Sequence, residues 1–444
     1  MKKTIPSIFL LVLLLFSAFR PAAAETLRVK ETPTGAGWLE HSDQGDLILH
    51  VAGSWHDIGI QEASLLKEEA QVAVRSAKFA VWLNAPYIPV SVALKQIYKQ
   101  VALFQAANYP EVFREEMEAI AEESGIPLDL IQTLHATTYL TSCETAAAWG
   151  PVTSDRALHF IRSNDVEIAI DPATGKSYHA MGVIVIYQPL DGVPFMMFSW
   201  PGFIGASDGM NAEGIAIGNM SLPSKYETPD GIPMPFRLKQ ALARSRTLDE
   251  AVDWLTRKPL EGGYNFIVAD AKIPAAVALE MDAKTVYIGG WDGPAESNAY
   301  DFLGRHYQYT PVEGLVMRAN HPLSDELIAH REKPMDDGVP HSHWSYQRYA
   351  DLRSRLLGAY GRLTLDSMYD LLRESYRAVD WEKGPTLGGT SHQLAFSPLN
   401  GDFRIAWCEG NPLVNGRRTV SAFNQPVRCY NFFELLKRKP DGHD

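Results

Sequence analysis

Beyond its first two dozen residues the chain has no long hydrophobic run, and no later stretch is apolar for the roughly 20 residues that a transmembrane helix needs. The N-terminus differs: Lys2 and Lys3 precede an apolar segment at Ile8–Phe16, and Ala22–Ala24 forms a small-residue cleavage site. This order is typical of a secretory signal peptide, and an uncleaved anchor is disfavoured because Arg20-Pro21 interrupts the short apolar run. We therefore expect residues 1–24 to be removed after Ala24. The mature protein should then be soluble and periplasmic or secreted, with no membrane insertion.

A cluster of basic residues is also missing. The formal charge is −12, and removing residues 1–24 takes away three basic residues and no acidic one, which lowers it to −15. An acidic chain without a basic patch argues against nucleic acid and anionic membranes as partners. Neither a G-x-S-x-G element nor a glycine-rich phosphate loop occurs, and we expect no cofactor.

Metal-ligand spacing is weak as well. His341-Ser342-His343, with His321 and His330 upstream, is the group that comes nearest to a metal cluster. This H-x-H pair has no acidic or cysteine partner at ligand spacing, so we expect no metal. A metal-dependent hydrolase using His341 and His343 is the weakest alternative.

Cysteine is scarce: the chain has only Cys143, Cys408 and Cys429. Three cysteines in an exported protein leave at least one unpaired. The simplest arrangement pairs Cys408 with Cys429 and leaves Cys143 free. Three buried, unpaired cysteines are the alternative, because spacing does not determine connectivity.

No low-complexity linker or internal repeat divides the chain, so one compact domain is expected after the signal peptide. Residues 25–142 form a helix-rich segment, and residues 143–444 form a segment in which short β-branched and aromatic runs dominate. Helices are expected to recur at 235–244, 248–256, 343–357 and 365–374. This order favours an α+β architecture in which antiparallel sheets lie between helical layers.

Cys143 carries the strongest chemical signal. If the Ser142–Cys143 bond is cut, the new α-amine titrates at about 7.7–8.0 and can act as a base for the thiol of the same residue. The thiol can make this cut itself, by attacking the carbonyl of Ser142 to give a thioester that water opens. The alternative is a small buried core cysteine, the commonest state of a free thiol.

The run Arg162-Ser163-Asn164-Asp165-Val166-Glu167 follows 19 residues later, on a strand expected to return beside Cys143. Residues i and i+3 of a strand point to opposite faces, so a bend or bulge near Ser163-Asn164 is expected to aim Arg162 and Asp165 inward together. Asp165 would hold the α-ammonium of Cys143, and the charge of Arg162 would favour a thiolate. The alternative is an ordinary surface ion pair.

These residues resemble the acyl-CoA:6-aminopenicillanate acyltransferase family of self-processing peptidases and the related choloylglycine hydrolases, which include bile-salt hydrolases and penicillin V acylases. The resemblance covers most of the mature chain, including Gly53–Gly59, Phe113–Leu134, the G-M-N-x-x-G-I motif at Gly209–Ile215, and Tyr264–Asp270. It implies the αββα fold of the N-terminal-nucleophile (Ntn) hydrolases.

The resemblance also implies roles for three further residues. Asn211 of the G-M-N motif would help form the oxyanion hole, Asn320 would be a second catalytic asparagine, and Arg348 the distal active-site arginine. Side-chain amides aimed at an oxyanion are worth about 2.7–4 kcal/mol per donor. The alternative for each asparagine is a turn or a satisfied buried amide.

Three residues depart from the family pattern: Ser142 before the cut, Glu144 after the cysteine, and Val166 after the aspartate. A carboxylate at Glu144 would disfavour the thiolate or select a cationic substrate. We expect an exported cysteine amidohydrolase or acyltransferase that cuts itself into 25–142 and 143–444, which stay associated. It would cleave small-molecule acyl-amides through a Cys143 acyl-thioester. A non-enzymatic, uncut binding protein on the same fold is the main alternative.

Overall fold

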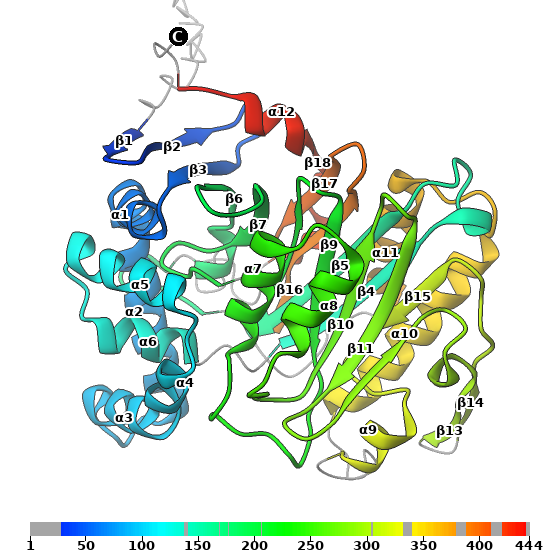
Figure 1. The fold of residues 1–444 in the computed structure, drawn as a ribbon. Helices are drawn as coiled ribbons and strands as arrows, with labels where there is room; N and C mark the ends of the chain where they lie inside the picture. Colours follow the sequence, from blue (N-terminus) through cyan, green and yellow to red (C-terminus); the bar gives the residue numbers. More distant parts are fainter. Residues whose placement is uncertain are drawn as a thin grey trace, which may run out of the picture.

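The computed structural model describes residues 28–136, 141–167, 169–175, 177–205, 207–302, 305–331, 340–378, 388–409 and 420–440. The predicted signal peptide lies outside these residues. Two β-sheets pack face to face, and helices cover the outer face of each (Figure 1). No helix of the described chain is long and apolar enough to cross a membrane.

The larger described sheet has ten strands and the smaller has six. In spatial order, the larger sheet contains β1 (Arg28–Thr32), β2 (Gly35–His41), β3 (Leu47–Gly53), β6 (Val183–Pro189), β7 (Phe195–Ser199), β8 (Asp208–Asn211), β9 (Ile215–Ser221), β10 (Tyr264–Asp270), β11 (Ala275–Met281) and β12 (Val286–Gly289). The smaller sheet contains β15 (Leu315–Arg318), β4 (Thr141–Ala148), β5 (His159–Glu167), β16 (Gly388–Ser397), β17 (Asp402–Trp407) and β18 (Arg428–Asn431). A separate ribbon pairs β13 (Ala299–Phe302) with β14 (Arg305–Gln308). Within the two sheets the strand pairs are antiparallel except for the parallel pair β3–β6.

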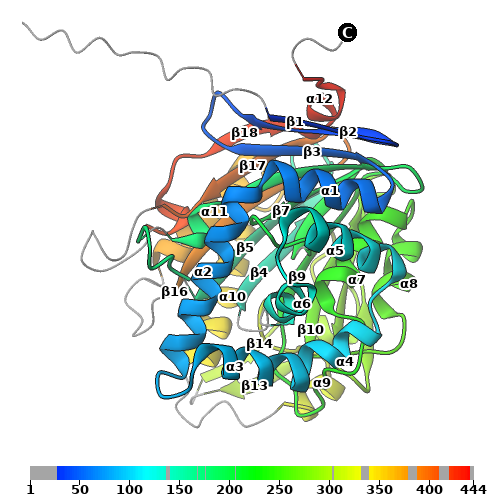
Figure 2. The same cartoon turned by 90° about the vertical axis from the view of Figure 1, so that its left-hand side faces the viewer.

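Helices from the N-terminal segment lie over the larger sheet (Figure 2). They are α1 (Trp55–Leu65), α2 (Lys67–Asn84), α3 (Val90–Ile97), α4 (Leu103–Ala107), α5 (Glu111–Ser124) and α6 (Leu128–Ala136), and α7 (Met234–Arg244) and α8 (Leu248–Thr256) extend the layer. Ser54 caps α1 by accepting the amide proton of Asp57, and Gly125 ends α5 in the left-handed conformation.

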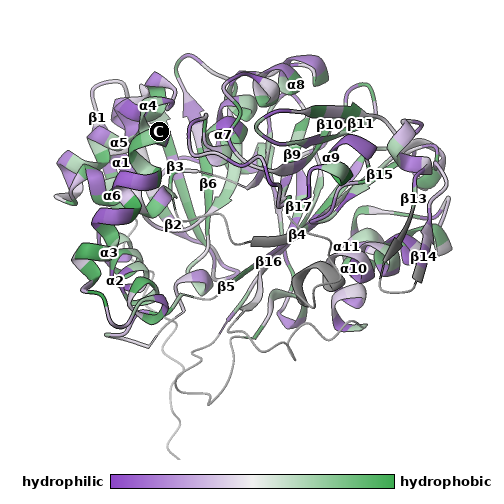
Figure 3. Cartoon of the chain, turned by 90° about the horizontal axis from the view of Figure 1, so that it is seen from below, coloured by the Kyte–Doolittle hydropathy of each residue, from purple (hydrophilic) through white to green (hydrophobic). Residues whose placement is uncertain are grey.

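The helices α10 (Pro340–Gly358) and α11 (Leu365–Ala378) cover the smaller sheet, and α9 (Asp325–Ala329) and α12 (Phe432–Lys437) are short. Strands of the larger sheet such as β3 and β6 are hydrophobic along much of their length (Figure 3), because they contact a helical layer on one face and the other sheet on the opposite face. The layers therefore run helix, sheet, sheet, helix. The predicted α+β class is confirmed, and so are the helices expected at 235–244, 248–256, 343–357 and 365–374.

The N-terminal segment is more than a helical cap. Its strands β1, β2 and β3 extend the larger sheet, and β3 pairs with β6 from the second segment of the chain. The predicted cut between Ser142 and Cys143 falls inside β4, where Thr141 pairs with Val166 and Ser142 with Asp165. The two predicted fragments are thus parts of one sheet system.

The bulge expected near Ser163-Asn164 is wrong. The β4–β5 register runs without interruption from Thr141–Val166 to Ala148–His159, and the register shift lies in β16, between Thr390 and His392. Because the strand alternates regularly, Arg162 and Asp165 point to opposite faces of the smaller sheet.

The predicted disulfide is also wrong, because all three cysteines are free, with Cys408 buried and Cys429 exposed. The strand register gives the reason. Cys429 on β18 lies opposite Arg404 of β17, four residues before Cys408. At about 3.3 Å per strand residue the two cysteines stand far beyond the roughly 7 Å Cα separation that a disulfide allows.

Candidate active site

Cys143 lies on the inner strand β4 and is fully buried. It pairs with Asn164 of β5, and its Sγ donates a hydrogen bond to Asn164 Oδ1 at 3.3 Å. On the same side, Nη2 of Arg162 lies 3.5 Å from Sγ. The thiol thus faces the space between the two sheets, with a fixed positive charge beside it, as the sequence predicted for Arg162.

The backbone nitrogen of Cys143 is held by Asn320. It donates to Asn320 Oδ1 at 2.6 Å, and Asn320 Nδ2 donates to the carbonyl and hydroxyl oxygens of Ser221 at 2.8 and 3.0 Å. The register explains this contact, because β15 pairs Arg318 with Thr145 and the chain then continues to Asn320 beside Cys143. The nitrogen that would become the α-amine therefore already has an acceptor.

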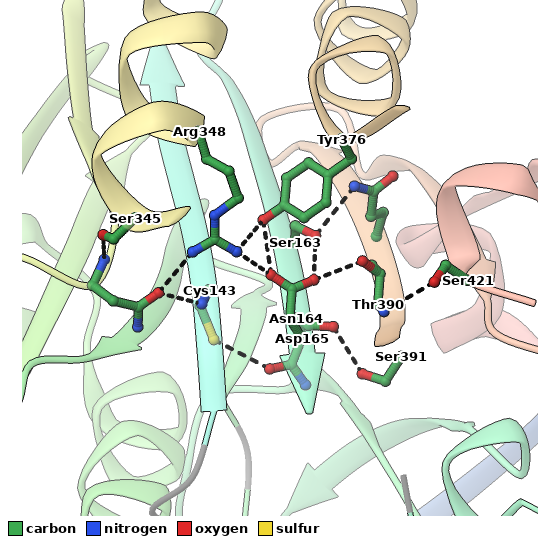
Figure 4. A network of polar contacts seen from close by, with 12 residues as sticks. Cys143, Ser163, Asn164, Asp165, Ser345, Arg348, Tyr376, Thr390, Ser391 and Ser421 are labelled. Atoms are coloured by element: carbon green, nitrogen blue, oxygen red, sulfur yellow. Dashed lines mark hydrogen bonds and ion pairs between the residues drawn. The ribbon is translucent and has the colours of Figure 1, made fainter. Parts of the chain in front are cut away.

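Arg348 reaches from α10 to Asp165, with which its Nη1 forms an ion pair (Figure 4). Its Nη2 donates to Asn320 Oδ1 at 3.0 Å, so Arg348 joins Asn320 to Asp165. Asp165 also accepts hydrogen bonds from Tyr376 at 3.0 Å and Thr390 at 2.7 Å. Burial raises the pKa of Asp165, although Arg348 opposes this shift. Asp165 was expected to hold the Cys143 nitrogen itself; in the structure it holds Arg348, which bonds to the direct partner, Asn320.

Arg162 lies on the opposite face of the smaller sheet from Asp165, in the space between the two sheets. Its Nε lies 3.1 Å from Asp208 Oδ2, and its Nη2 donates to Asn219 Oδ1 at 3.3 Å. His392 Nε2 lies 2.9 Å from the same oxygen of Asp208. Burial raises the pKa of Asp208, but His392 and Arg162 outweigh it and hold that pKa below its usual range. A charged carboxylate thus fixes the guanidinium beside the thiol.

A glycine allows the larger sheet to approach this guanidinium. A Cβ on Gly218 of β9 would lie 3.0 Å from Arg162 Cδ, 3.1 Å from Thr145 Oγ1 and 3.2 Å from Phe160 Cε1. These separations are tighter than ordinary van der Waals contacts. The position of Arg162 therefore depends on β9 as well as on its own strand.

Asn211 does not take part in this site. Its Nδ2 donates to the carbonyls of Leu242 and Ser245 at 2.9 and 2.8 Å, while its Oδ1 accepts the amide protons of Glu213 and Ile215. Its amide is thus fully engaged in joining the β8–β9 turn to the end of α7. The predicted oxyanion role is wrong, and the alternative of a satisfied buried amide describes Asn211.

Asn219 is the residue that sequence reasoning missed. It lies on β9 in the run Ile215–Ser221, is buried, and contacts Arg162, which also contacts the thiol. One signal could have identified it, because asparagine is depleted in strands and this one interrupts an apolar strand. The structure thus brings together Cys143, Arg162, Asp165, Asn320 and Arg348 and adds Asn219.

Glu144 follows Cys143 and is fully buried, with neither carboxyl oxygen hydrogen-bonded to any described residue. Alternation along β4 turns its side chain away from the thiol, toward the helix-facing layer that holds Ala146 and Ala148. Burial raises the pKa of Glu144 to about 8; Arg348 opposes the shift, and Asp165 and Asp351 add to it. The Glu144 carboxyl is therefore protonated and neutral at pH values below about 8.

The side chains of His341 and His343 lie outside what the structure describes. Within the described residues, no group of three or more histidine, cysteine, aspartate or glutamate side chains could hold a metal ion.

Helix, sheet, sheet, helix layering with a buried cysteine on an inner strand is the arrangement of the Ntn hydrolases. The family model described as acyl-coenzyme A:6-aminopenicillanic acid acyl-transferase matches residues 160–412, more than half of the chain. The chain belongs to this family, as its motifs predicted.

Curated relatives extend beyond the part that this chain matches. An uncharacterized protein of Archaeoglobus fulgidus is 24% identical over 363 residues, which are 76% of this chain and 59% of that protein. Protein dcd1B of Dictyostelium discoideum is 23% identical over 286 residues, 60% of this chain and 56% of dcd1B. The chain thus spans less than two thirds of the length of these relatives.

Solved structures with related folds align at low identity. A Caenorhabditis elegans ortholog of N-acylethanolamine-hydrolyzing acid amidase aligns at 15% identity and a TM-score of 0.38, over 58% of this chain and 93% of that one. A mutant of conjugated bile acid hydrolase from Clostridium perfringens aligns at 12% identity and a TM-score of 0.39, over 68% of this chain and 95% of that one. Penicillin V acylase from Agrobacterium tumefaciens aligns at 13% identity and a TM-score of 0.38, over 66% of this chain and 87% of that one.

Proposed function

We propose that this protein is an exported cysteine amidohydrolase that first cuts its own chain before Cys143 and then cleaves linear acyl-amides. One observation carries the proposal: the Cys143 nitrogen is held by Asn320 Oδ1 at 2.6 Å while Arg162 lies 3.5 Å from the thiol of the same residue. Base and nucleophile would then share one residue, as an N-terminal nucleophile requires.

This geometry supports the proposed cut. Sγ of Cys143 attacks the carbonyl carbon of Ser142, the thiol proton passes to the departing nitrogen, and the C–N bond breaks to give a thioester. Water then hydrolyses the thioester, which leaves a carboxylate on Ser142 and regenerates the thiol with a free α-amine on Cys143. The fragments should stay associated, because β3 of the first pairs with β6 of the second.

Turnover repeats the same chemistry on a separate acyl-amide. The α-amine takes the thiol proton, Sγ attacks the acyl carbonyl, and the leaving amine receives a proton as the acyl-thioester forms. Asn219 Nδ2, beside Arg162, is the proposed oxyanion donor in place of Asn211. Water resolves the thioester in a hydrolase and an amine resolves it in an acyltransferase. We favour hydrolysis, since acyl-CoA is not a donor outside the cytoplasm and residues 1–24 have the pattern of an export signal.

The primary test is the intact mass of the purified protein under denaturing conditions, together with hydrolysis of a fluorogenic N-acyl aminocoumarin series. The wild type should give two chains, the second beginning at Cys143. Cys143→Ala should give one folded chain with no turnover, and Cys429→Ala, at an exposed free thiol, should behave as the wild type. Cutting of Cys143→Ala would refute the mechanism. A folded, uncut wild type would favour the binding-protein alternative.

A second test separates the two asparagines. Asn219→Ala should lower kcat about 10²–10³-fold while the protein still folds, because one oxyanion donor is lost. Asn211→Ala should instead lower the thermal midpoint, because four hydrogen bonds are lost, with little change in kcat per folded molecule. Steady-state kinetics and thermal melts on both variants check this. The reverse pattern would restore Asn211 as the oxyanion donor.

A further inference from the structure

Glu144 has no role in the proposed reaction, yet it lies one residue from the nucleophile with both oxygens buried and without a hydrogen bond to any described residue. Leaving a buried polar group unsatisfied costs about 1–3 kcal/mol. Such a group on a strand that carries the nucleophile points to a functional constraint. The inference below rests on the proposed self-processing.

The groups facing Glu144 can be taken element by element. Strand β5 presents Asp165, and helix α10 presents Arg348 and Asp351. Helix α11 presents Tyr376, whose environment includes Arg348, Asp165 and Glu144. On the other side, β15 places Met317 opposite Ala146 and contributes an apolar side chain. One cation and two other carboxyls thus surround Glu144.

In the intact chain the charge of this cluster is already balanced. Arg348 pairs with Asp165, and Tyr376 and Thr390 complete the bonds of that carboxylate. A second carboxylate at Glu144 would be buried without a positive partner within ion-pair distance among the described residues. Glu144 therefore stays protonated before the cut, in agreement with the raised pKa of about 8 that burial gives it.

The cut adds one positive charge to the same network, because the Cys143 nitrogen is linked through Asn320 to Arg348. The Cys143 nitrogen changes from an amide into an amine that binds a proton. Its acceptor, Asn320, is neutral and already receives a hydrogen bond from Arg348, which is itself a cation. Asp165 already forms an ion pair with Arg348. The α-ammonium therefore needs a negative charge that the rest of the described cluster does not supply.

We propose that Glu144 is the counter-ion of the matured N-terminus: a neutral carboxylic acid in the intact chain, and a carboxylate once the Cys143 α-amine exists. The step is a proton transfer, in which the Glu144 O–H bond breaks, an N–H bond forms on the amine, and carboxylate and ammonium result. No other reactant is needed. Glu144 is thus a positioning residue, which acts through the amine and sets the pH at which that amine can accept the thiol proton.

The amine can be observed directly, because the chain has only three cysteines and the proposed cut frees the nitrogen of Cys143 alone. In protein labelled with [¹⁵N]cysteine, the amine resonance is followed against pH. Removing an adjacent carboxylate should lower the pKa of the amine, so its midpoint should fall by about one pH unit in Glu144→Gln. The acid limb of kcat/KM should move down by the same amount.

Glu261→Gln is the matched control. Burial also raises the pKa of Glu261 to about 8, but this residue bonds to Gln105, Met234 and Tyr264 near α4 and α7. It should leave the amine midpoint unchanged. An equal shift in both variants, or no shift in Glu144→Gln, would overturn the inference.

Infrared spectroscopy gives a test that does not require Glu144→Gln to fold. Bands common to both forms, such as that of Glu261, cancel in the difference spectrum of uncut Cys143→Ala and cut wild type near pH 6.5. This spectrum should retain one band of a buried protonated carboxylic acid, present only in the uncut form. Its absence would mean that Glu144 has the same protonation state in both forms, which would overturn the proposal. Failure of the proposed function looks different, because the wild type would then give a single mass and no amine resonance.

Discussion

Two clusters in this protein each combine one buried cation with two buried carboxyls, and they differ in how completely their bonds are made. Lys239 of α7 donates to both oxygens of Glu116, at 2.6 and 2.8 Å, and to Tyr187 at 3.3 Å. Tyr187 in turn donates to Glu62. Near Cys143, Arg348 and Asp165 are similarly bonded, but Glu144 has no hydrogen bond to a described residue.

The difference separates a cluster that only stabilises the fold from one to which we assign a function. The Lys239 cluster links α1, α5, α7 and β6, and both of its carboxyls have a bonded partner. The Arg348 cluster holds the Cys143 nitrogen through Asn320, and one of its carboxyls, that of Glu144, has no hydrogen bond to a described residue. Fully satisfied buried networks stabilise one conformation, whereas a buried group left unsatisfied needs a reason. Under the proposed mechanism, the reason lies in the cut state of the chain.

The largest expected effect comes from removing the cation of the satisfied cluster. Lys239→Met leaves Glu116 and Glu62 buried without their positive partner, and it should lower the free energy of unfolding by about 3–5 kcal/mol. Urea denaturation measures this, with Lys437→Met at an exposed lysine as the control. A loss below about 1 kcal/mol would mean that the Lys239 cluster does not stabilise the fold, and the comparison would fail.

A smaller effect on stability distinguishes Glu116 from Glu144. It is measured in the uncut Cys143→Ala background. Glu116→Gln breaks two bonds to Lys239 and should cost about 1–3 kcal/mol near pH 7. Glu144→Gln breaks none. Because the pKa of Glu144 is higher in the folded chain than in the unfolded one, the intact chain should lose stability as pH rises from about 4.5 to about 8.

Glu144→Gln removes that loss, so its stability relative to Cys143→Ala should increase through the same pH window. The expected slope is at most about 1.4 kcal/mol per pH unit, which corresponds to one proton. Urea denaturation at several pH values measures it. A pH-independent difference would show that the pKa of Glu144 is the same in the folded and the unfolded chain, and therefore not raised by burial.

Much of the site could be predicted because its signals are local. The α+β order, the helices after residue 234, and the positions of Cys143, Arg162, Asp165, Asn320 and Arg348 all follow from short patterns or from motif resemblance. Errors arose where a side chain's role depends on distant partners. Asn211 stands in a recognisable motif, but the carbonyls of Leu242 and Ser245 engage its amide. Asn219 lies in no motif considered, and only the packing of β9 against Arg162 reveals it.

Register caused the remaining errors. A one-residue offset decides which face a strand residue occupies and which residue lies opposite it. Composition alone does not specify that Cys429 lies opposite Arg404, or that the irregularity of the β5–β16 pair belongs to β16. The predicted disulfide and the predicted bulge both failed at this level.

The register of β4 has a consequence for how substrates are selected. Ser142 and Thr141 pair with Asp165 and Val166, so the bond proposed for cutting lies inside a continuous sheet. Under the proposed mechanism the chain is its own first substrate, and the departing Ser142 leaves the backbone of β5 without a partner at that point. A later acyl donor would then bind beside the backbone of β5, where Ser142 was paired before the cut. Molecules that present an extended amide alongside β5 should therefore be recognised before any side-chain contact is made.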